Sequence, residues 1–198
     1  MVWSPSRETW AAGERARVRY LFAPDVPPGV QVPPSPALLA LRDAVLHAWT
    51  GVSSGGTARP SDRRTGGHDP HLAGFAVDFM LAPGPARAVF GAALASWCVE
   101  HAEELGLQYV LHDRYEWSAS HVGPRWEPYT GSDPHVDHVH VELGPDARAW
   151  SAEVMRAKVL AALSAPSWRA WVGPGVLALV LALGAVVVCR AEVSDGRG

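Results

Sequence analysis

Two segments constrain the fold of this chain more than any other part: in residues 74–81 and 137–143, every second side chain from Phe75 and from Val139 is large and apolar. Because successive side chains of a β-strand face opposite ways, each segment predicts a strand with one face in a core. The apolar faces hold Phe75, Val77, Phe79 and Leu81 in the first segment and Val139, Val141 and Leu143 in the second. The opposite faces hold groups that bind metals, Asp78 in one strand and His138 and His140 in the other. We therefore predict neighbouring strands that present metal ligands on their non-core face.

Two further residues complete a candidate metal site. His71 lies an odd number of residues before Asp78, so we expect it in the preceding loop, where Gly74 lets the backbone turn back. Asp137 has the opposite parity to the two histidines, so we expect it to lean over the site from the mouth of its strand. Two imidazoles and a carboxylate match a catalytic zinc site, which keeps a fourth position for water. Zinc lowers the pKa of that water to about 7 and polarises a carbonyl, so hydrolysis needs no Ser or Cys nucleophile.

The two motifs, H-x-x-G-x-A-x-D at His71–Asp78 and D-H-x-H at Asp137–His140, resemble those of a known group of zinc peptidases. This group contains D-alanyl-D-alanine carboxypeptidases and L-alanyl-D-glutamate endopeptidases, and its superfamily includes lysostaphin-type enzymes and hedgehog signalling domains. The resemblance covers roughly residues 37–145 and includes GLQYVLHDRYEWS and DPHVDHVHVEL, which are similar to actinobacterial and phage members. It implies the α+β fold of that superfamily and zinc as the cofactor.

The resemblance also implies a role for each matching residue. His71, Asp78 and His140 would be the metal ligands. Asp137, three residues before the last ligand, would be the general base, and His138 would orient the site.

Arg59, in the sequence TARPSD, matches the arginine that contacts the substrate in such enzymes. Arg63 and Arg64 lie close by and stay open as alternatives. The chain departs from the family two residues before the first ligand, where Asp69 stands in place of a common serine. Which residues form hydrogen bonds with the metal ligands is therefore left open.

The other elements follow from hydrophobic spacing and turn residues. We expect helices at 37–49, 85–105 and 146–163, strands at 51–59 and, as a pair, within 107–118, and a loop at 120–134. In that loop, Trp126 and Tyr129 either line a substrate cleft or pack on the surface. Helices that flank a mostly antiparallel sheet make the predicted fold α+β.

The remaining histidines are weaker candidates. His68, His121 and His135 lie in loops rich in Gly, Pro and Asp, and we expect them at the surface. His112 belongs to a predicted strand that could turn its side chain either toward the site or away from it.

The chain is expected to contain four parts. They are an N-terminal arm and Pro-rich linker at 1–35, a zinc peptidase-like domain at 36–165, a transmembrane helix at 168–190 and a short polar tail at 191–198. Residues 170–189 are uncharged, and 20 helical residues at a rise of 1.5 Å match a hydrocarbon core of about 30 Å. Trp168 and Trp171 lie where an interfacial aromatic belt would place them. These features predict a single-pass membrane protein.

The side of the membrane is left open. Residues 1–20 contain no apolar region typical of a secretory signal peptide, and the positive charges marginally favour a cytoplasmic catalytic domain. Cross-linked peptidoglycan lies outside the membrane, so three alternatives remain. They are a phage lysis enzyme, which we favour, export by the C-terminal span, and action on cytoplasmic D-Ala-containing peptides.

Composition excludes several other classes of function. A net charge of −3 with mixed signs gives no excess of positive charge typical of a nucleic-acid-binding protein. Cys98 lies in a helical pattern and Cys189 in an apolar run, so neither resembles an activated thiol. Two cysteines also cannot build a disulfide framework.

The function expected from the resemblance is zinc-dependent cleavage of a peptide bond in the peptidoglycan stem, by a carboxypeptidase or an endopeptidase of endolysin type. The expected partner is therefore a stem peptide or another D-Ala-containing peptide, and the oligomeric state stays open. The alternative is a non-catalytic, zinc-stabilised binding module for the cell wall or for a partner, anchored in the membrane. A hydrolase of another substrate is a third possibility, because a fold does not specify its chemistry.

Overall fold

The computed structural model describes residues 5–57, 66–121 and 125–165. Contacts divide the chain into two units, Met1–Leu163 and Ser164–Gly198, and the second falls almost entirely outside the described residues. The account below therefore concerns the first unit.

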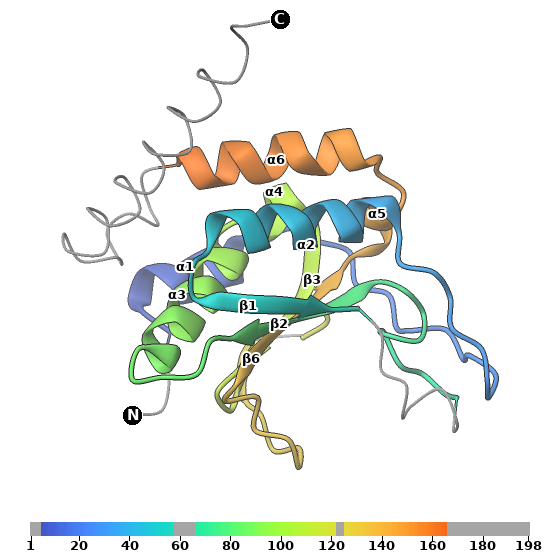
Figure 1. The fold of residues 1–198 in the computed structure, drawn as a ribbon, viewed down its shortest axis with the longest axis horizontal. Coiled ribbons are helices and arrows are strands. Elements are labelled where there is room, and N and C mark those ends of the chain that lie inside the picture. Colours follow the sequence, from blue (N-terminus) through green and yellow to red (C-terminus); the bar gives the residue numbers. More distant parts are fainter. Residues whose placement is uncertain (1–4, 58–65, 122–124, 166–198) are drawn as a thin grey trace, which may run out of the picture. The chain divides into compact units, whose positions relative to one another are not determined.

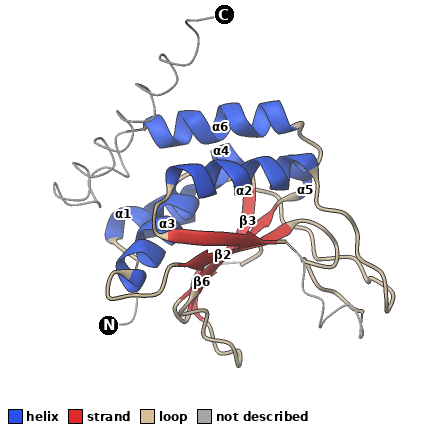
Figure 2. Cartoon of the chain, in the orientation of Figure 1, coloured by secondary structure: helices blue, strands red, loops and turns tan. Residues whose placement is uncertain are grey.

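The first unit is built on a six-stranded antiparallel sheet (Figures 1 and 2). Its strands are β1 (Val52–Gly56), β2 (Ala76–Leu81), β3 (Leu107–His112), β4 (Tyr115–Ser118), β5 (Trp126–Pro128) and β6 (His138–Leu143). They lie in the order β1-β2-β6-β3-β4-β5, so β6, the last in sequence, is inserted between β2 and β3. This arrangement makes the two motif-bearing strands direct neighbours, and the predicted α+β class with an antiparallel sheet is confirmed.

Helices cover one face of this sheet (Figure 2). They are α1 (Arg7–Arg15), α2 (Pro36–Ala48), α3 (Arg87–Glu100), α4 (Ala102–Leu105), α5 (Pro145–Arg148) and α6 (Ala152–Ser164). Helix α2 packs on β1 and β2, whereas α3 packs on β3 and β6. Helix α2 begins at a favourable cap, because the Ser35 side chain accepts a hydrogen bond from the Leu38 N–H and Pro36 occupies the first turn.

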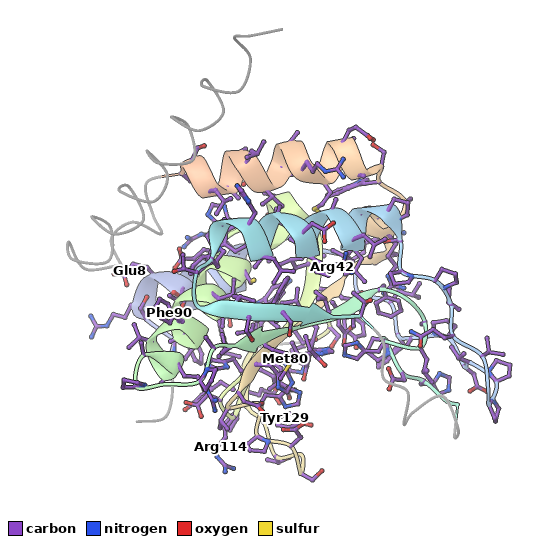
Figure 3. The ribbon with its side chains drawn as sticks, viewed as in Figure 1. Glu8, Arg42, Met80, Phe90, Arg114 and Tyr129 are labelled. Atoms are coloured by element: carbon purple, nitrogen blue, oxygen red, sulfur yellow. The ribbon has the colours of Figure 1, made fainter. Side chains whose placement is uncertain are left out.

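The core lies between these helices and the sheet, as the alternation of the two strands predicts. The large apolar side chains assigned to that face are all buried: Phe75, Val77, Phe79, Leu81, Val139, Val141 and Leu143. Buried residues on the helices include Leu38, Leu41 and Leu94. None of the helices within the described residues lies over the other face of the sheet, and Figure 3 shows Met80 and Tyr129 on the side away from Arg42 of α2.

Helix α1 was not predicted, and it lies in the segment expected to be an arm. Its Thr9 is buried and donates a hydrogen bond of 2.7 Å to Glu100 of α3. Gly13 lets α1 approach the sheet closely, since a Cβ atom there would come within 2.7 Å of the Trp117 ring. Trp10 stacks on Trp126, with ring centroids 6.1 Å apart. These tertiary contacts stabilise a short helix that local sequence preference would leave marginal.

The Pro-rich segment before α2 runs beside the loop that contains His71. Val26 forms an isolated antiparallel bridge with Gly67, and the Val32 N–H donates to the Leu72 carbonyl. The Gln31 side chain also donates a hydrogen bond of 3.0 Å to the His71 carbonyl. The segment therefore supports the loop that reaches the candidate site.

The predicted transmembrane helix requires a correction. Within residues 5–57, 66–121 and 125–165, no helix is both long and apolar enough to cross a membrane. The longest helix in these ranges, α3, has 14 residues, whereas a bilayer core needs about 20 apolar ones. This finding overturns the membrane-spanning part of the predicted fold class and the single-pass membrane localisation. The segment that prompted the prediction, residues 170–189, lies outside the described residues.

Candidate metal centre

Three of the predicted site residues converge on the open face of the sheet. The His71 Nε2 atom lies 3.2 Å from the His140 Nδ1 atom and 3.2 Å from the Asp78 Oδ1 atom. The His140 Nδ1 atom lies 2.8 Å from the same Asp78 oxygen. All three side chains are buried. A loop imidazole and two strand side chains thus meet at one point, as the alternation of the strands and the parity of His71 predict.

Strand register brings two of these groups together. Asp78 on β2 and His140 on β6 are directly opposed Cα partners in the antiparallel ladder. Directly opposed side chains project from the same face of a sheet. Ala76 on the same face is a small neighbour, as expected, and it opposes Glu142.

The third group depends on a tight turn. Gly74 adopts φ 78°, a left-handed conformation that L-residues with a side chain rarely adopt, and its N–H donates to the His71 carbonyl. Asp69 accepts hydrogen bonds from the backbone N–H groups of His71 (2.7 Å) and Leu72 (3.2 Å). Its carboxylate therefore shapes the turn that presents His71.

The electrostatics of the three groups are strongly coupled. Burial alone would raise the pKa of Asp78, but hydrogen bonds with His140 and His71 hold that pKa far below its usual range. Burial alone would lower the pKa of His140, but hydrogen bonds with Asp78 and Glu142 raise it to about 9. The hydrogen bond between Asp78 and His140 therefore favours the charged form of each group.

The His140 ring is also oriented from its other side. Its Nε2 atom lies 3.3 Å from the Glu142 Oε1 atom, and Gln108 donates a hydrogen bond of 2.8 Å to the other Glu142 oxygen. Histidines that bind metals usually donate their second N–H group to a carboxylate in this way. Glu142 therefore leaves Nδ1 as the ligand atom of His140.

The spacing of the three groups fits a tetrahedral metal ion. Ligand atoms about 2.0–2.1 Å from zinc lie roughly 3.4 Å apart at tetrahedral angles. The observed separations of 2.8, 3.2 and 3.2 Å are slightly contracted, as expected when hydrogen bonds link the same atoms. Two imidazole nitrogens and one carboxylate oxygen suit zinc and other first-row divalent cations.

Asp137 and His138 form a pair at the edge of this centre. The Asp137 Oδ1 atom accepts a hydrogen bond of 2.8 Å from the His138 Nδ1–H group, and its side chain is 51% exposed. The His138 Nε2 atom lies 3.8 Å from the Asp78 Oδ1 atom. The hydrogen bond from His138 lowers the pKa of Asp137. Asp137 thus stands beside the centre, ionised and open to solvent.

His135 is a neighbour that sequence analysis missed, and the prediction that it lies at the surface is wrong. It is buried, and its ring centroid lies 4.4 Å from that of His138 and 6.0 Å from that of His140. Its backbone adopts φ 51°, and its carbonyl accepts a hydrogen bond from the Asp113 N–H at the β3–β4 turn. Burial lowers the pKa of His135. The spacing H-x-x-H-x-H was the one signal for it, because the loop composition indicated exposure.

The structure answers the open question about His112. Its side chain is buried on the helix side of the sheet, because a Cβ atom on Gly91 of α3 would collide with the His112 ring. The Nδ1 atom lies 2.9 Å from the His138 carbonyl oxygen, and burial lowers the pKa of His112. His112 therefore contacts the backbone behind the centre and not the centre itself.

The two aromatic residues of the 120–134 loop have different surroundings. Trp126 belongs to β5, which was not predicted, and it is buried against Trp10 of α1. Tyr129 lies on the open face, with its ring 5.5 Å from that of His135. Of the pair, only Tyr129 is placed to border a site at the metal centre. The substrate-contacting candidates Arg59, Arg63 and Arg64 lie outside the described residues.

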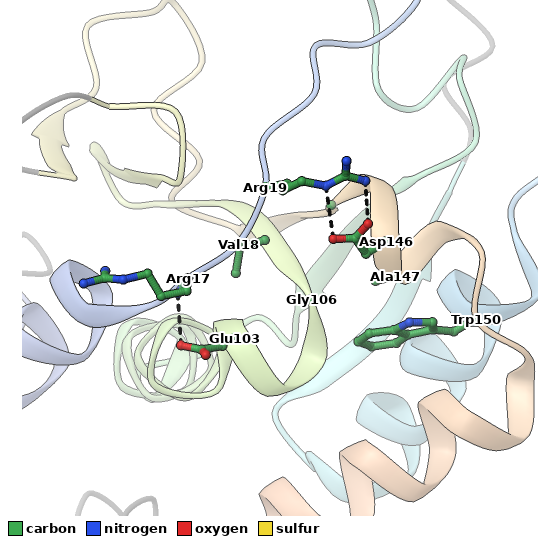
Figure 4. Close-up of a pocket in the computed structure, with 9 residues that line it drawn as sticks. Arg17, Val18, Arg19, Glu103, Gly106, Asp146, Ala147 and Trp150 are labelled. Carbon is green, nitrogen blue, oxygen red and sulfur yellow. Dashed lines mark hydrogen bonds and ion pairs between the residues drawn. The ribbon is translucent and has the colours of Figure 1, made fainter.

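A small pocket lies elsewhere, between the N-terminal segment and the β6–α5 connection (Figure 4). It holds about 80 Å³, and the charged side chains that line it already have partners. Arg19 pairs with Asp146, and Glu103 accepts a hydrogen bond from the Arg17 backbone N–H. None of the centre's residues lines it.

Comparison with known proteins gives one match. No curated protein and no solved structure matches the chain. A family model described as "VldE, C-terminal domain" matches residues 33–140, which is more than half of the 198 residues. The matched range begins just before α2 and ends at His140, so it includes His71, Asp78 and the Asp137–His138 pair. The chain therefore belongs to the VldE C-terminal domain family.

Proposed function

We propose that this protein is a divalent-metal-dependent peptidase, with zinc as the preferred cation, that cleaves a peptide bond in a peptidoglycan stem peptide or another D-Ala-containing peptide. One observation supports the metal-dependent chemistry above all others: His71, Asp78 and His140 meet within 3.2 Å of one another. The choice of substrate rests on the resemblance of the two motifs to zinc peptidases.

His71, Asp78 and His140 would hold the cation. Three protein ligands leave a coordination position for water or substrate, and a cation there supplies Lewis-acid activation. The chain's own part is to orient these ligands before substrate arrives. Glu142 orients His140, and Asp69 orients the His71 turn.

Asp137 is the proposed general base. Because its pKa is lowered, the side chain is a carboxylate at neutral pH and can accept a proton. Its hydrogen bond to His138 fixes the direction of the carboxylate, and its half-exposed side chain can meet a substrate. The same carboxyl group would then return the proton to the leaving amine.

The centre lies on the open face of the sheet, where its three ligand side chains are buried and the Asp137 side chain is 51% exposed. No helix lies over that face in Figure 2, whereas the helices lie over the other face. Tyr129 borders the centre through His135 and offers an aromatic surface beside it. An extended peptide can therefore approach Asp137 from solvent.

The direct test is incubation of the zinc-loaded chain with purified muropeptides and with D-Ala-D-Ala, followed by mass spectrometry. We expect a product shorter by the residues on one side of the cleaved bond, and no product from the chelator-treated chain. The His140→Ala variant should also give no product, whereas Asp43→Asn, which changes an exposed carboxylate of α2, should retain activity. Stoichiometric zinc without cleavage of any of these peptides would instead favour a non-catalytic, zinc-stabilised binding module.

A further inference from the structure

A second cluster of metal-binding groups lies beside the first. One ligand atom from each of Asp133, His135 and His138 lies within 4.8 Å of the others, and both histidines are buried. We propose that these three residues form a second divalent-cation site, adjacent to the centre of His71, Asp78 and His140. The inference goes beyond the proposed hydrolysis, because a second cation can be counted whether or not the protein cleaves a peptide.

Hydrogen bonds select the nitrogen that each histidine offers. The His135 Nδ1 atom lies 2.7 Å from the Asp133 carbonyl oxygen, which can only accept, so Nδ1 bears the proton. The His138 Nδ1–H group likewise donates to the Asp137 carboxylate. Each ring therefore keeps the lone pair on Nε2, and an imidazole whose other nitrogen donates to an oxygen is the usual form of a metal ligand.

The His138 Nε2 atom is the strongest single indication. The side chain is only 7% exposed, and Nε2 makes no hydrogen bond with the described residues. A buried nitrogen without a hydrogen bond is costly, and a bound cation would remove that cost. This nitrogen lies 3.8 Å from the Asp78 Oδ1 atom, which is the proposed ligand atom of Asp78 in the first centre.

The two centres are close enough to act together. The His135 ring centroid lies 4.4 Å from that of His138 and 6.0 Å from that of His140, a ligand of the first centre. Paired catalytic cations commonly lie about 3.5–4 Å apart. The Asp78 Oδ1 atom lies 2.8 Å from the His140 Nδ1 atom and 3.8 Å from the His138 Nε2 atom, so Asp78 is placed to be shared between the two centres.

The backbone holds the second cluster in place. His135 has φ 51°, a left-handed conformation that is uncommon for residues other than glycine, and three hydrogen bonds maintain it. The Asp133 Oδ1 atom accepts the His135 N–H, and the N–H groups of Asp113 and Arg114 donate to the carbonyls of His135 and Pro134. The rings are thus positioned before any cation binds.

A third group of possible ligands, Glu116, His121 and Glu127, provides a matched comparison. It lies on β4, β5 and the loop between them, and its histidine side chain is 23% exposed. The His121→Ala variant therefore removes a histidine from a cluster of similar composition but greater exposure.

The test counts cations. The chelator-treated chain is titrated with Co²⁺, followed by visible absorption, and zinc content is measured by elemental analysis after desalting. We expect two equivalents of Co²⁺ or zinc per chain for the unaltered protein and for His121→Ala, and one equivalent for His135→Asn. Asparagine tolerates the left-handed backbone but removes the Nε2 ligand, so this variant should fold, as thermal unfolding of the metal-free protein would verify. X-ray absorption should show a metal–metal distance of about 3.5–4 Å that His135→Asn abolishes.

Two results would overturn the second site: a single equivalent in the unaltered protein, or a second equivalent that His121→Ala removes and His135→Asn does not. The hydrolysis assay separates this outcome from failure of the proposed function. A one-cation protein that cleaves muropeptides would leave the peptidase proposal standing without the second site. A two-cation protein that cleaves no peptide would support the second site alone.

Discussion

Asp78 and His140 lie directly opposite each other on the adjacent antiparallel strands β2 and β6, and the Asp78 Oδ1 atom lies 2.8 Å from the His140 Nδ1 atom. The cross-strand pair is buried on the face of the sheet that the helices leave open. This pair anchors the proposed metal centre. The hydrogen-bonded ladder of β2 and β6 places Asp78 and His140, whereas His71 reaches the centre from a loop. A pair set by backbone hydrogen bonds is a rigid base for a metal site.

The first prediction concerns the shared carboxylate. Asp78→Asn should weaken zinc binding by at least about 100-fold, because it replaces a charged ligand between two imidazoles with a neutral amide. Competition against a chromophoric chelator measures this affinity, with Asp43→Asn as the control. Equal affinity in the two variants would exclude Asp78 as a ligand.

The second prediction concerns the carboxylate behind His140. Glu142→Gln should weaken metal binding by about 10-fold to 100-fold, because the His140 Nε2–H group loses a charged acceptor. The size and shape of the side chain are preserved, so the fold should be unaffected. Calorimetric titration with zinc checks the change, and an unaltered affinity would show that Glu142 does not tune this ligand.

The third prediction separates chemistry from metal binding. Asp137→Asn should retain the zinc content of the unaltered protein while lowering kcat for muropeptide cleavage by about 100-fold to 10,000-fold, the usual contribution of a general base. Elemental analysis and mass-spectrometric rate measurements on the same sample test both parts. If turnover is unchanged in the zinc-loaded variant, Asp137 is not the base.

The fourth prediction concerns pH and stability. Burial raises the pKa of Glu100 above its ordinary value of 4.5, although the Thr9 hydroxyl group lowers it in part. A raised carboxyl pKa means that stability is fully present below about pH 4.5 and is lost as pH rises through the folded-state value. Glu100→Gln, whose amide oxygen can still accept from Thr9, should therefore gain stability relative to the unaltered protein between pH 4 and pH 7.

Denaturant unfolding of the metal-free proteins at several pH values measures this difference. The free energy of unfolding of Glu100→Gln, minus that of the unaltered protein, should increase toward neutral pH. A difference that stays constant across the range would contradict the assigned burial effect.

The fifth prediction compares two left-handed glycines. Gly74→Ala should destabilise the protein more than Gly29→Ala, although φ is similar at 78° and 81°. A Cβ atom at Gly74 would come within 2.5 Å of the Pro33 carbonyl oxygen, whereas a Cβ atom at Gly29 would meet nothing within 4 Å. Gly29→Ala should therefore cost only the backbone term of about 1–2 kcal/mol.

Urea unfolding measures both variants, and zinc titration adds a second readout. Gly74→Ala should also weaken zinc binding, because the turn at Gly74 presents His71. Equal losses of stability, with unaltered zinc affinity, would show that the close approach of the Pro-rich segment is unimportant.

Sequence alone determined the faces of β2 and β6. Alternation is a property of the extended backbone, so the separation of Phe79 from Asp78 and of Val141 from His140 follows from residue order. The need for a turn between His71 and Asp78 followed in the same way, and the left-handed Gly74 meets it.

Tertiary structure decided which residues meet across the sheet. The opposition of Asp78 and His140 depends on a register set by packing between helices and sheet, and no local pattern specifies it. His135 was predicted at the surface because its loop is polar, yet hydrogen bonds to the distant β3–β4 turn bury it beside His138. Helix α1 likewise depends on contacts with Trp117 and Trp126, residues more than a hundred positions along the chain. Local sequence sets the direction of a side chain, whereas long-range packing sets its neighbours.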